Sequence, residues 1–311
     1  MKVLFRLVAL ICFAECAVPG VAQQRPKILG IAHVSYASRD LEASRAFYRG
    51  WLGLEEVSTW TENGRTAFTF FKINDRQFVE LTPEKQEGTD RFGDLSFETN
   101  DAEAMRQYLA AKGVAVPAQV THGRIGNVAF KITDPAGHVV EFVQYMPAGQ
   151  TMGDVGRHLG AERISTHMTH AGMIVTELDP EYRFYTQVLG FTETWRGSSD
   201  GKTLSWINLK MPDSMDYVEF MLYKEEPAPT KRGSAHHICL VVPDVPAAVA
   251  KLKARPYATT YGRPLEDDHV GRNRKRQANL FDPDGTRTEL MEPVTIDGKP
   301  TPPSMAPWPP Q

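Results

Sequence analysis

The stretch RAFYRGWLGLEE, residues 45–56, returns later in the chain as YRFYTQVLGFTE, residues 182–193. Both copies contain the pattern F-Y-x3-L-G followed by a large apolar residue. In each copy the phenylalanine lies 14 residues after a histidine, from His33 to Phe47 and from His170 to Phe184. Amphipathic helices that end at glycine are common. A shared distance of this kind to a preceding histidine is uncommon, so it indicates an internal repeat.

A second pattern repeats in the same way. ITDPAGHVVEF (132–142) and LFDPDGTRTEL (280–290) share D-P-x-G-x3-E, a proline–glycine turn followed by a strand that carries a glutamate. Helices are expected around 102–109 and 245–252 from apolar residues at i, i+3/i+4 and i+7. The repeats predict four modules of the form strand–helix–strand–strand–strand. The modules begin near His33, Asp94, His170 and His237, and their last strands carry Glu80, Glu141, Glu219 and Glu289.

Composition and the chain ends limit the function classes. The chain has 311 residues and a net charge of −3, which gives no indication of a nucleic-acid partner. Residues 1–22 have a basic start, an apolar run too short to span a membrane and a small-residue site, which predicts a signal peptide and a periplasmic or secreted protein. The repeats place one domain at 27–148 and another at 167–294. Between and after them lie a linker at 149–166 and a proline-rich tail at 295–311.

The glutamates of the last strands require a chemical partner. Alternate side chains of a strand share one face, so Glu80 in FVELT and Glu219 in YVEFM are predicted to face the same way as large apolar neighbours. An unpaired buried carboxylate is costly. A divalent cation would neutralise several such groups at once, and imidazole with carboxylate suits Zn, Ni, Co, Mn or Fe(II).

Paired βαβββ modules that begin with a histidine and end with a glutamate resemble the vicinal oxygen chelate (VOC) superfamily. This is the group of glyoxalases, bleomycin-resistance proteins and extradiol dioxygenases. The resemblance covers roughly residues 28–293. It implies an α+β fold of two tandem VOC domains, in which paired modules form a curved, partly open mixed sheet around a central cleft. It also implies a small-molecule substrate, in a monomer or a homodimer.

The resemblance further implies a metal site in each domain, with ligands from the first and last strands of the paired modules. In the C-terminal domain these positions hold His170, Glu219, His237 and Glu289, and in the N-terminal domain His33, Glu80, Asp94 and Glu141. Two carboxylates balance a divalent cation, whereas three leave negative charge in a poorly solvated site. The C-terminal set is therefore the predicted metal site. The N-terminal set is expected to be degenerate or to take a harder cation.

Three activities stay open. A set of two histidines and two glutamates is similar to glyoxalase- and epimerase-like lyases or isomerases, in which Glu219 or Glu289 would act as the base. An extradiol dioxygenase would use Fe(II) on His170, His237 and Glu289, but its signature places a tyrosine three residues before D-P, where this chain has Lys131 and Asn279. A bleomycin-resistance-like protein would sequester a ligand without turnover.

The loop EDDHVGRNRKRQ (266–277) contains the candidate substrate residues. His269 and Arg272 are expected to hold an anionic group, unless the loop is simply a solvated charged segment.

Overall fold

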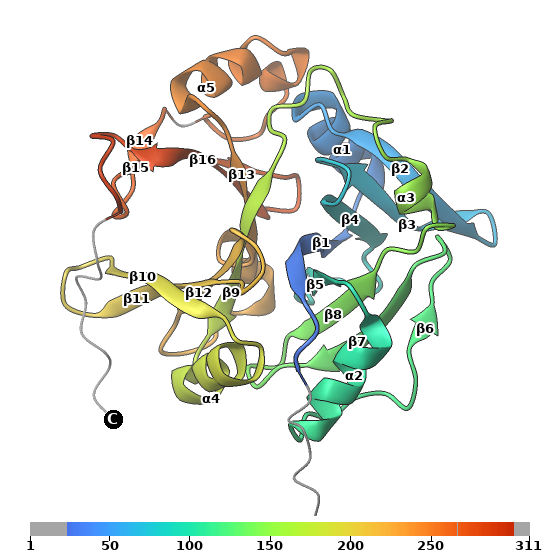
Figure 1. Cartoon of the computed structure of the whole chain (residues 1–311). Coiled ribbons are helices and arrows are strands. Elements are labelled where there is room, and N and C mark those ends of the chain that lie inside the picture. The colour runs from blue at the N-terminus through green and yellow to red at the C-terminus, as the bar shows by residue number, and fades with distance from the viewer. Residues whose placement is uncertain (1–23, 266, 302–311) are drawn as a thin grey trace, which may run out of the picture.

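The computed structural model describes residues 24–265 and 267–301, which form two eight-stranded sheets side by side (Figure 1). The predicted signal peptide at 1–22 lies outside the described residues, as does the end of the predicted tail from 302 onward. The first sheet has the order β2-β3-β4-β1-β5-β8-β7-β6. Its strands are β1 (Ile28–Ser38), β2 (Glu55–Glu62), β3 (Arg65–Lys72), β4 (Phe78–Pro83), β5 (Phe92–Thr99), β6 (Thr121–His122), β7 (Val128–Thr133) and β8 (Val139–Gln144).

The second sheet repeats this topology strand for strand, in the order β10-β11-β12-β9-β13-β16-β15-β14. Its central strands pair alternately: β12 with β9 parallel, β9 with β13 antiparallel and β13 with β16 parallel. The predicted fold of two tandem α+β domains, each with a curved mixed sheet, is confirmed. The strands are β9 (Met168–Val175), β10 (Thr192–Ser198), β11 (Leu204–Lys210), β12 (Tyr217–Leu222), β13 (His237–Val241), β14 (His269–Val270), β15 (Lys275–Phe281) and β16 (Arg287–Thr295).

Each of the four modules places a helix after its first strand. Three of these helices begin at an aspartate whose carboxylate accepts backbone N–H groups, a preferred N-cap arrangement: Asp40, Asp101 and Asp244. The helices are α1 (Leu41–Arg45), α2 (Ala102–Ala111), α4 (Leu178–Arg183) and α5 (Val245–Lys253), with a short α3 (Gln150–Gly153) between the domains. None of the helices in residues 24–265 and 267–301 has the length and apolar character that a membrane span requires.

The F-Y-x3-L-G pattern forms a π-helical turn rather than the regular helix end that its spacing predicts. α1 and α4 continue as η1 (Ala46–Trp51) and η2 (Phe184–Val188). The N–H of Leu52 donates to Phe47 O, five residues earlier, at 2.9 Å, and Leu189 repeats this bond at 3.1 Å. The following glycines, with φ of 75° and 78°, adopt the left-handed conformation that ends the turn.

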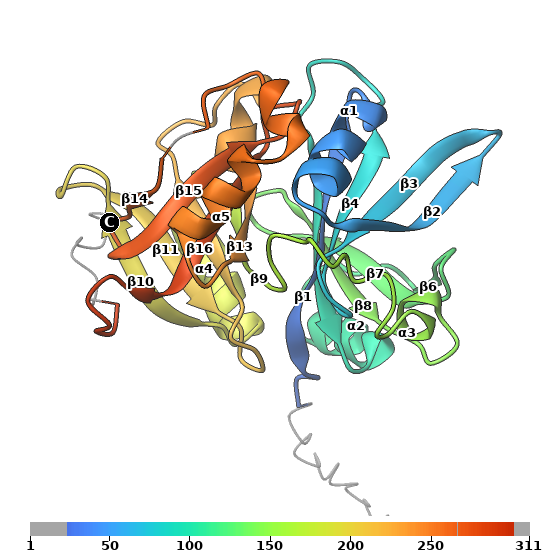
Figure 2. The ribbon, with the colours of Figure 1, turned by 90° about the horizontal axis from the view of Figure 1, so that it is seen from above.

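The helices lie at the interface between the two sheets. Figures 1 and 2 show α1 beside α5, and Figure 1 shows α2 beside α4 on the other side of the same interface. Trp51, which ends η1, is fully buried there, and its Nε1 donates to Leu252 O of α5 at 2.9 Å. Tyr108 of α2 donates to Val188 O of η2 at 2.8 Å. One hydrophobic core therefore runs through both domains.

The two repeated sequence patterns meet across this interface. The tyrosine of each F-Y-x3-L-G pattern donates to the aspartate of the D-P-x-G turn in the other domain. Tyr48 OH lies 3.2 Å from Asp282 Oδ2, and Tyr185 OH lies 3.3 Å from Asp134 Oδ2. All four side chains are buried. The patterns thus join the domains reciprocally, in addition to shaping each domain.

Candidate metal centre

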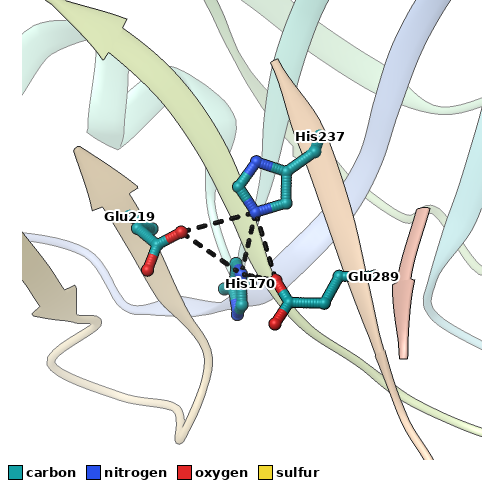
Figure 3. Close-up of side chains that lie close together, drawn as sticks. All are labelled: His170, Glu219, His237 and Glu289. Atoms are coloured by element: carbon teal, nitrogen blue, oxygen red, sulfur yellow. Dashed lines mark hydrogen bonds and ion pairs between the residues drawn. The ribbon is translucent and has the colours of Figure 1, made fainter. Parts of the chain in front are cut away.

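The C-terminal sheet brings its four predicted ligands together. They come from the four central strands β9, β12, β13 and β16, and Figure 3 shows them pointing toward one another. The Nε2 atoms of His170 and His237 are 3.1 Å apart. Glu289 Oε2 lies 3.5 Å from both of these nitrogens, and Glu219 Oε2 lies 3.4 Å from His237 Nε2 and 3.8 Å from His170 Nε2.

The orientation of His237 suits a ligand. Its Nδ1 lies 2.8 Å from the carbonyl oxygen of Ala235, an acceptor that would hold the hydrogen on Nδ1 when Nε2 binds a metal. Nε2 points into the cluster (Figure 3). The imidazole packs directly over Gly172, where a Cβ would come within 2.1 Å of the ring. Gly172 lies opposite both Glu219 and His237 in the sheet register, so its missing side chain makes room for the cluster.

The charges of the cluster favour a divalent cation. Burial acts to raise the pKa of Glu289, but hydrogen bonds with His170 and His237 hold that pKa well below its ordinary value. The pKa of Glu219 is lowered through the same two histidines, again against the effect of burial. Two ionised carboxylates and two imidazoles around a divalent cation would be neutral overall.

The donor atoms of the four residues are close enough together to bind one metal ion. One donor atom from each of the four residues lies within 4.8 Å of all the others, and three of the four residues are buried. Nitrogen and carboxylate oxygen donors suit Zn, Ni, Co, Mn or Fe(II). The residues therefore fit a transition metal at this position.

Arg287 is a site residue that the sequence analysis missed. Its Nη2 lies 2.9 Å from both ring nitrogens of His237. It stands two residues before Glu289 on β16, so both side chains are on the cleft-facing side of the strand. The period-2 rule applied backwards from Glu289 would have found it.

A cavity of about 310 Å³ opens over the cluster. Glu219, Glu289, Arg287, Trp195 and Trp206 line it. The two predicted substrate residues, His269 on β14 and Arg272 just after it, also line this cavity. Arg272 also donates to Ser199 O at 2.7 Å, which ties this loop to the segment around Ser199.

The N-terminal sheet brings its four predicted residues together in a different way. His33 Nε2 lies 3.3 Å from Asp94 Oδ1, 3.4 Å from Glu80 Oε2 and 3.7 Å from Glu141 Oε1. Lys131, from the neighbouring strand β7, enters the cluster and donates to Asp94 Oδ2 at 2.5 Å. Its ammonium also lies 3.7 Å from Glu141 Oε2.

The pKa values of the N-terminal cluster describe an ion network that already has its own cations. Burial acts to lower the pKa of His33, but the hydrogen bond with Asp94 and the charges of Glu141 and Glu80 raise it to about 9. Burial acts to raise the pKa of Asp94, but His33 and Lys131 lower it to about 2. His33, Glu80 and Asp94 also bring donor atoms within 4.8 Å of one another, but unlike the C-terminal set this cluster contains a lysine that pairs with one of its carboxylates.

A third buried cluster lies at the domain interface and was not predicted from the sequence. His138 Nδ1 is 3.1 Å from Asp134 Oδ2 and 4.0 Å from Glu181 Oε1. Burial, followed by the charge of Asp134, raises the pKa of Glu181 to about 10, so this carboxyl group is protonated at neutral pH. The donor atoms of these three residues also lie within 4.8 Å of one another, and the raised pKa of Glu181 removes one of the charges that would favour a cation there.

Comparisons with known proteins agree with the fold. The 2,3-dioxygenase LapB from Pseudomonas sp. KL28 is 19% identical, with a TM-score of 0.67 over 91% of this chain and 99% of that one. The Mn(II)-bound glyoxalase from Novosphingobium aromaticivorans is 18% identical, with a TM-score of 0.65 over 91% and 89% of the two chains. An extradiol ring-cleaving dioxygenase from B. fuscum is 17% identical, with a TM-score of 0.66 over 92% and 78%. No curated protein matches this sequence.

The family assignment rests on a sequence model that matches twice. The model of the Glyoxalase/Bleomycin resistance protein/Dioxygenase superfamily matches residues 30–142 and again residues 167–290. The two matches correspond to the two sheets, and together they cover most of the chain. The chain belongs to the Glyoxalase/Bleomycin resistance protein/Dioxygenase superfamily.

Proposed function

We propose that this protein is a metal-dependent lyase or isomerase of the glyoxalase and epimerase type, which acts in its C-terminal cleft on a small oxygen-bearing substrate. The observation that carries this proposal is the cluster of His170, Glu219, His237 and Glu289, whose donor atoms lie within 4.8 Å of one another and whose two glutamates line a cavity. These four residues would hold a divalent cation beside the cavity, where a substrate oxygen could reach it.

The residues of the cleft divide the chemistry among them. When bound, a divalent cation supplies a Lewis acid that polarises a substrate carbonyl. Glu219 or Glu289 would take the proton from the adjacent carbon and return it at a neighbouring position. Arg287 and Arg272 would donate hydrogen bonds to an anionic oxygen of the substrate. Trp195 and Trp206, which line the cavity, would contact the apolar part of the substrate.

The position of Glu219 favours this activity over a dioxygenase. A triad of His170, His237 and Glu289 would leave Glu219 spare, yet its Oε2 lies within 3.4 Å of His237 Nε2. Ring cleavage is kept as the second candidate because dioxygenases are among the structurally similar proteins. The identity of the metal separates the two: iron would favour oxygen chemistry, and nickel, zinc or cobalt a lyase or isomerase.

The metal itself is the first thing to measure. We expect about one transition metal per chain, by mass spectrometry, in protein purified without chelators, and its loss in a His170→Ala/His237→Ala variant. Metal that stays in the variant would move the site to the N-terminal cluster. A metal-free wild type, even after reconstitution, would favour a sequestering protein instead.

Proton transfer is the second test. In heavy water, the metal-loaded protein should exchange the hydrogen next to the carbonyl of small 2-oxo and 2-hydroxycarbonyl compounds, followed by proton NMR. We expect Glu289→Gln to slow this exchange by about 10² or more while keeping part of the metal. Full exchange in Glu289→Gln, beside a loss in Glu219→Gln, would assign the base to Glu219. Oxygen uptake with catechols, with no proton exchange, would contradict the lyase or isomerase proposal.

We also infer that the protein works outside the cytoplasm, from the basic and apolar character of residues 1–22. Expression of the full-length chain followed by cell fractionation and N-terminal sequencing tests this. Cleavage near residue 22 and recovery outside the cytoplasm are expected. An uncleaved cytoplasmic chain would contradict it.

A further inference from the structure

The N-terminal cleft contains a cavity of about 280 Å³ with a different character from the C-terminal one. Its wall is a row of rings in edge-to-face contact: Phe68 with Phe70 at 5.7 Å, Phe70 with Phe78 at 5.9 Å, and Phe78 with Tyr145 at 6.5 Å. These residues belong to a small hydrophobic cluster that is separate from the main core. They line the cavity, and the main core is built without them.

Lys131 lies at the polar end of this cavity. Half of its side chain is exposed, and its ammonium bonds Asp94 at 2.5 Å and faces Glu141 at 3.7 Å. The ammonium therefore neutralises the carboxylates that a divalent cation would otherwise have to neutralise. An ammonium has three N–H donors, and Asp94 takes one of them.

The same position in the other domain has no cation. Lys131 lies opposite Glu141 in the sheet register, just as Asn279 lies opposite Glu289. Both residues stand three positions before the D-P-x-G turn. Among the described residues, Asn279 Oδ1 is buried and has no hydrogen-bond partner. One residue of the repeat thus places an ammonium against the carboxylates of the N-terminal cluster and a neutral amide at the matching position of the C-terminal cluster, where the cation Arg287 contacts His237 from another strand.

We propose that the N-terminal cleft is a metal-free binding site for a small aromatic molecule with an oxygen acceptor, in which Lys131 takes the place of the metal. The rings of Phe68, Phe70, Phe78 and Tyr145 contact the aromatic part of the ligand. The ammonium of Lys131 donates to its oxygen. This site is independent of the activity proposed for the C-terminal cleft, and its tests do not require that cleft to hold a metal.

An exchange of the two equivalent residues tests the role of Lys131. After incubation with Mn²⁺, which accepts carboxylate-rich sites, and removal of the excess, Lys131→Asn should bind one Mn²⁺ per chain more than the wild type. Asn279→Lys should bind one fewer. Lys131→Met removes the ammonium without adding an amide, so it keeps the test valid if the asparagine variant misfolds. Circular dichroism confirms the fold of each variant.

Two results would overturn this role. One is a wild-type protein that binds Mn²⁺ at His33, shown by loss of one ion in His33→Gln. The other is a folded Lys131→Asn and a folded Lys131→Met that both bind no more Mn²⁺ than the wild type. A C-terminal site without metal would contradict the proposed activity but would not affect the gain expected in the Lys131 variants.

A matched pair of probes tests the ligand class. Acetophenone and ethylbenzene have the same ring and similar size, but only acetophenone has an oxygen acceptor. By ligand-observed NMR we expect acetophenone to bind about tenfold more tightly than ethylbenzene, and Lys131→Met to abolish the difference. Phe70→Ala should weaken both probes. Equal binding of the two probes to the wild type, or binding that Phe70→Ala leaves unchanged, would overturn the binding site.

Discussion

Gly172 shows how one residue makes room for the second histidine of the C-terminal cleft. In β9 it lies opposite His237, and its place in the other domain is taken by Ser35, which lies opposite Asp94. A Cβ at Gly172 would overlap the ring of His237 at 2.1 Å, whereas the shorter Asp94 pairs with a serine at the matching position. The imidazole of His237 on β13 therefore requires a glycine at the opposite position of β9.

Gly172→Ala is therefore expected to displace His237 and weaken metal binding. Repositioning a ligand typically costs 10- to 100-fold in metal affinity, and we expect about that loss. Competition with a fluorescent chelator measures it. Ser35→Ala removes only a hydroxyl group from the matching position and should leave the C-terminal affinity unchanged. Equal affinity in wild type and Gly172→Ala would show that the imidazole can move without cost.

At the scale of elements, a turn of one domain packs on a helix of the other. The turn after β7 contains Asp134, and the N–H of Ala136 donates to Glu181 Oε2 of α4 at 2.9 Å. Glu181 is fully buried, and its pKa is raised from the ordinary 4.5 to about 10 by burial and by Asp134. A protonated Glu181 is thus part of the domain contact.

The stability of this contact depends on pH in a direction that follows from the raised pKa. The pKa of the Glu181 carboxyl group is about 4.5 in the unfolded chain and about 10 in the folded one. Its contribution to the free energy of unfolding is therefore fully present below about pH 4.5 and is lost as the pH rises toward about 10. Glu181→Gln imitates the protonated form at every pH. At pH 8.5 we expect it to be more stable than the wild type by on the order of 2 kcal/mol, or about 4 °C in Tm.

Thermal unfolding at pH 5 and pH 8.5 measures this difference. At pH 5 the two proteins should be nearly equal, because most of the wild-type contribution is still present there. Glu177→Gln makes the same exchange at an exposed position nearby and should have no effect at either pH. A Glu181→Gln variant that is less stable than the wild type at pH 8.5 would show that the ionised carboxylate is the stabilising form.

At the scale of the whole molecule, the two domains share one hydrophobic core. The indole of Trp51 lies 4.5 Å from the ring of Tyr261 and 5.2 Å from that of Tyr257 in the other domain. With the tyrosine–aspartate bonds in both directions, each domain covers apolar surface of the other. Separation would expose that surface to water.

We therefore expect one heat-capacity peak on thermal unfolding. Trp51→Ala should lower the free energy of unfolding by about 3–5 kcal/mol. At about 2 °C for each kcal/mol, the whole peak should move down by about 6–10 °C. Trp60→Ala, on the edge strand β2, serves as the control and should shift it far less. Two separate peaks, or a variant in which only part of the peak moves, would contradict a shared core.

Local sequence patterns predicted the order of the strands and helices and the positions of the donor residues. Module order, helix positions and the donor residues all follow from repeated spacings, because strand alternation and helix periodicity act over a few residues. The donors of the C-terminal cluster could be named for the same reason: each stands at the same place in its module. The π-helical turn at Phe47 escaped prediction because the apolar spacing of a short helix end does not distinguish i→i−5 from i→i−4 hydrogen bonds.

Other features depended on contacts between residues far apart in the chain. Lys131 enters the N-terminal cluster, Arg287 reaches His237, and Gly172 receives its ring only because the sheets pair in a particular register and curve. The bond from Tyr48 to Asp282 crosses between domains. Sequence spacing encodes which side of a strand a residue faces. The partner that it meets there is decided by how the strands and domains pack, because packing energy depends on all of them at once.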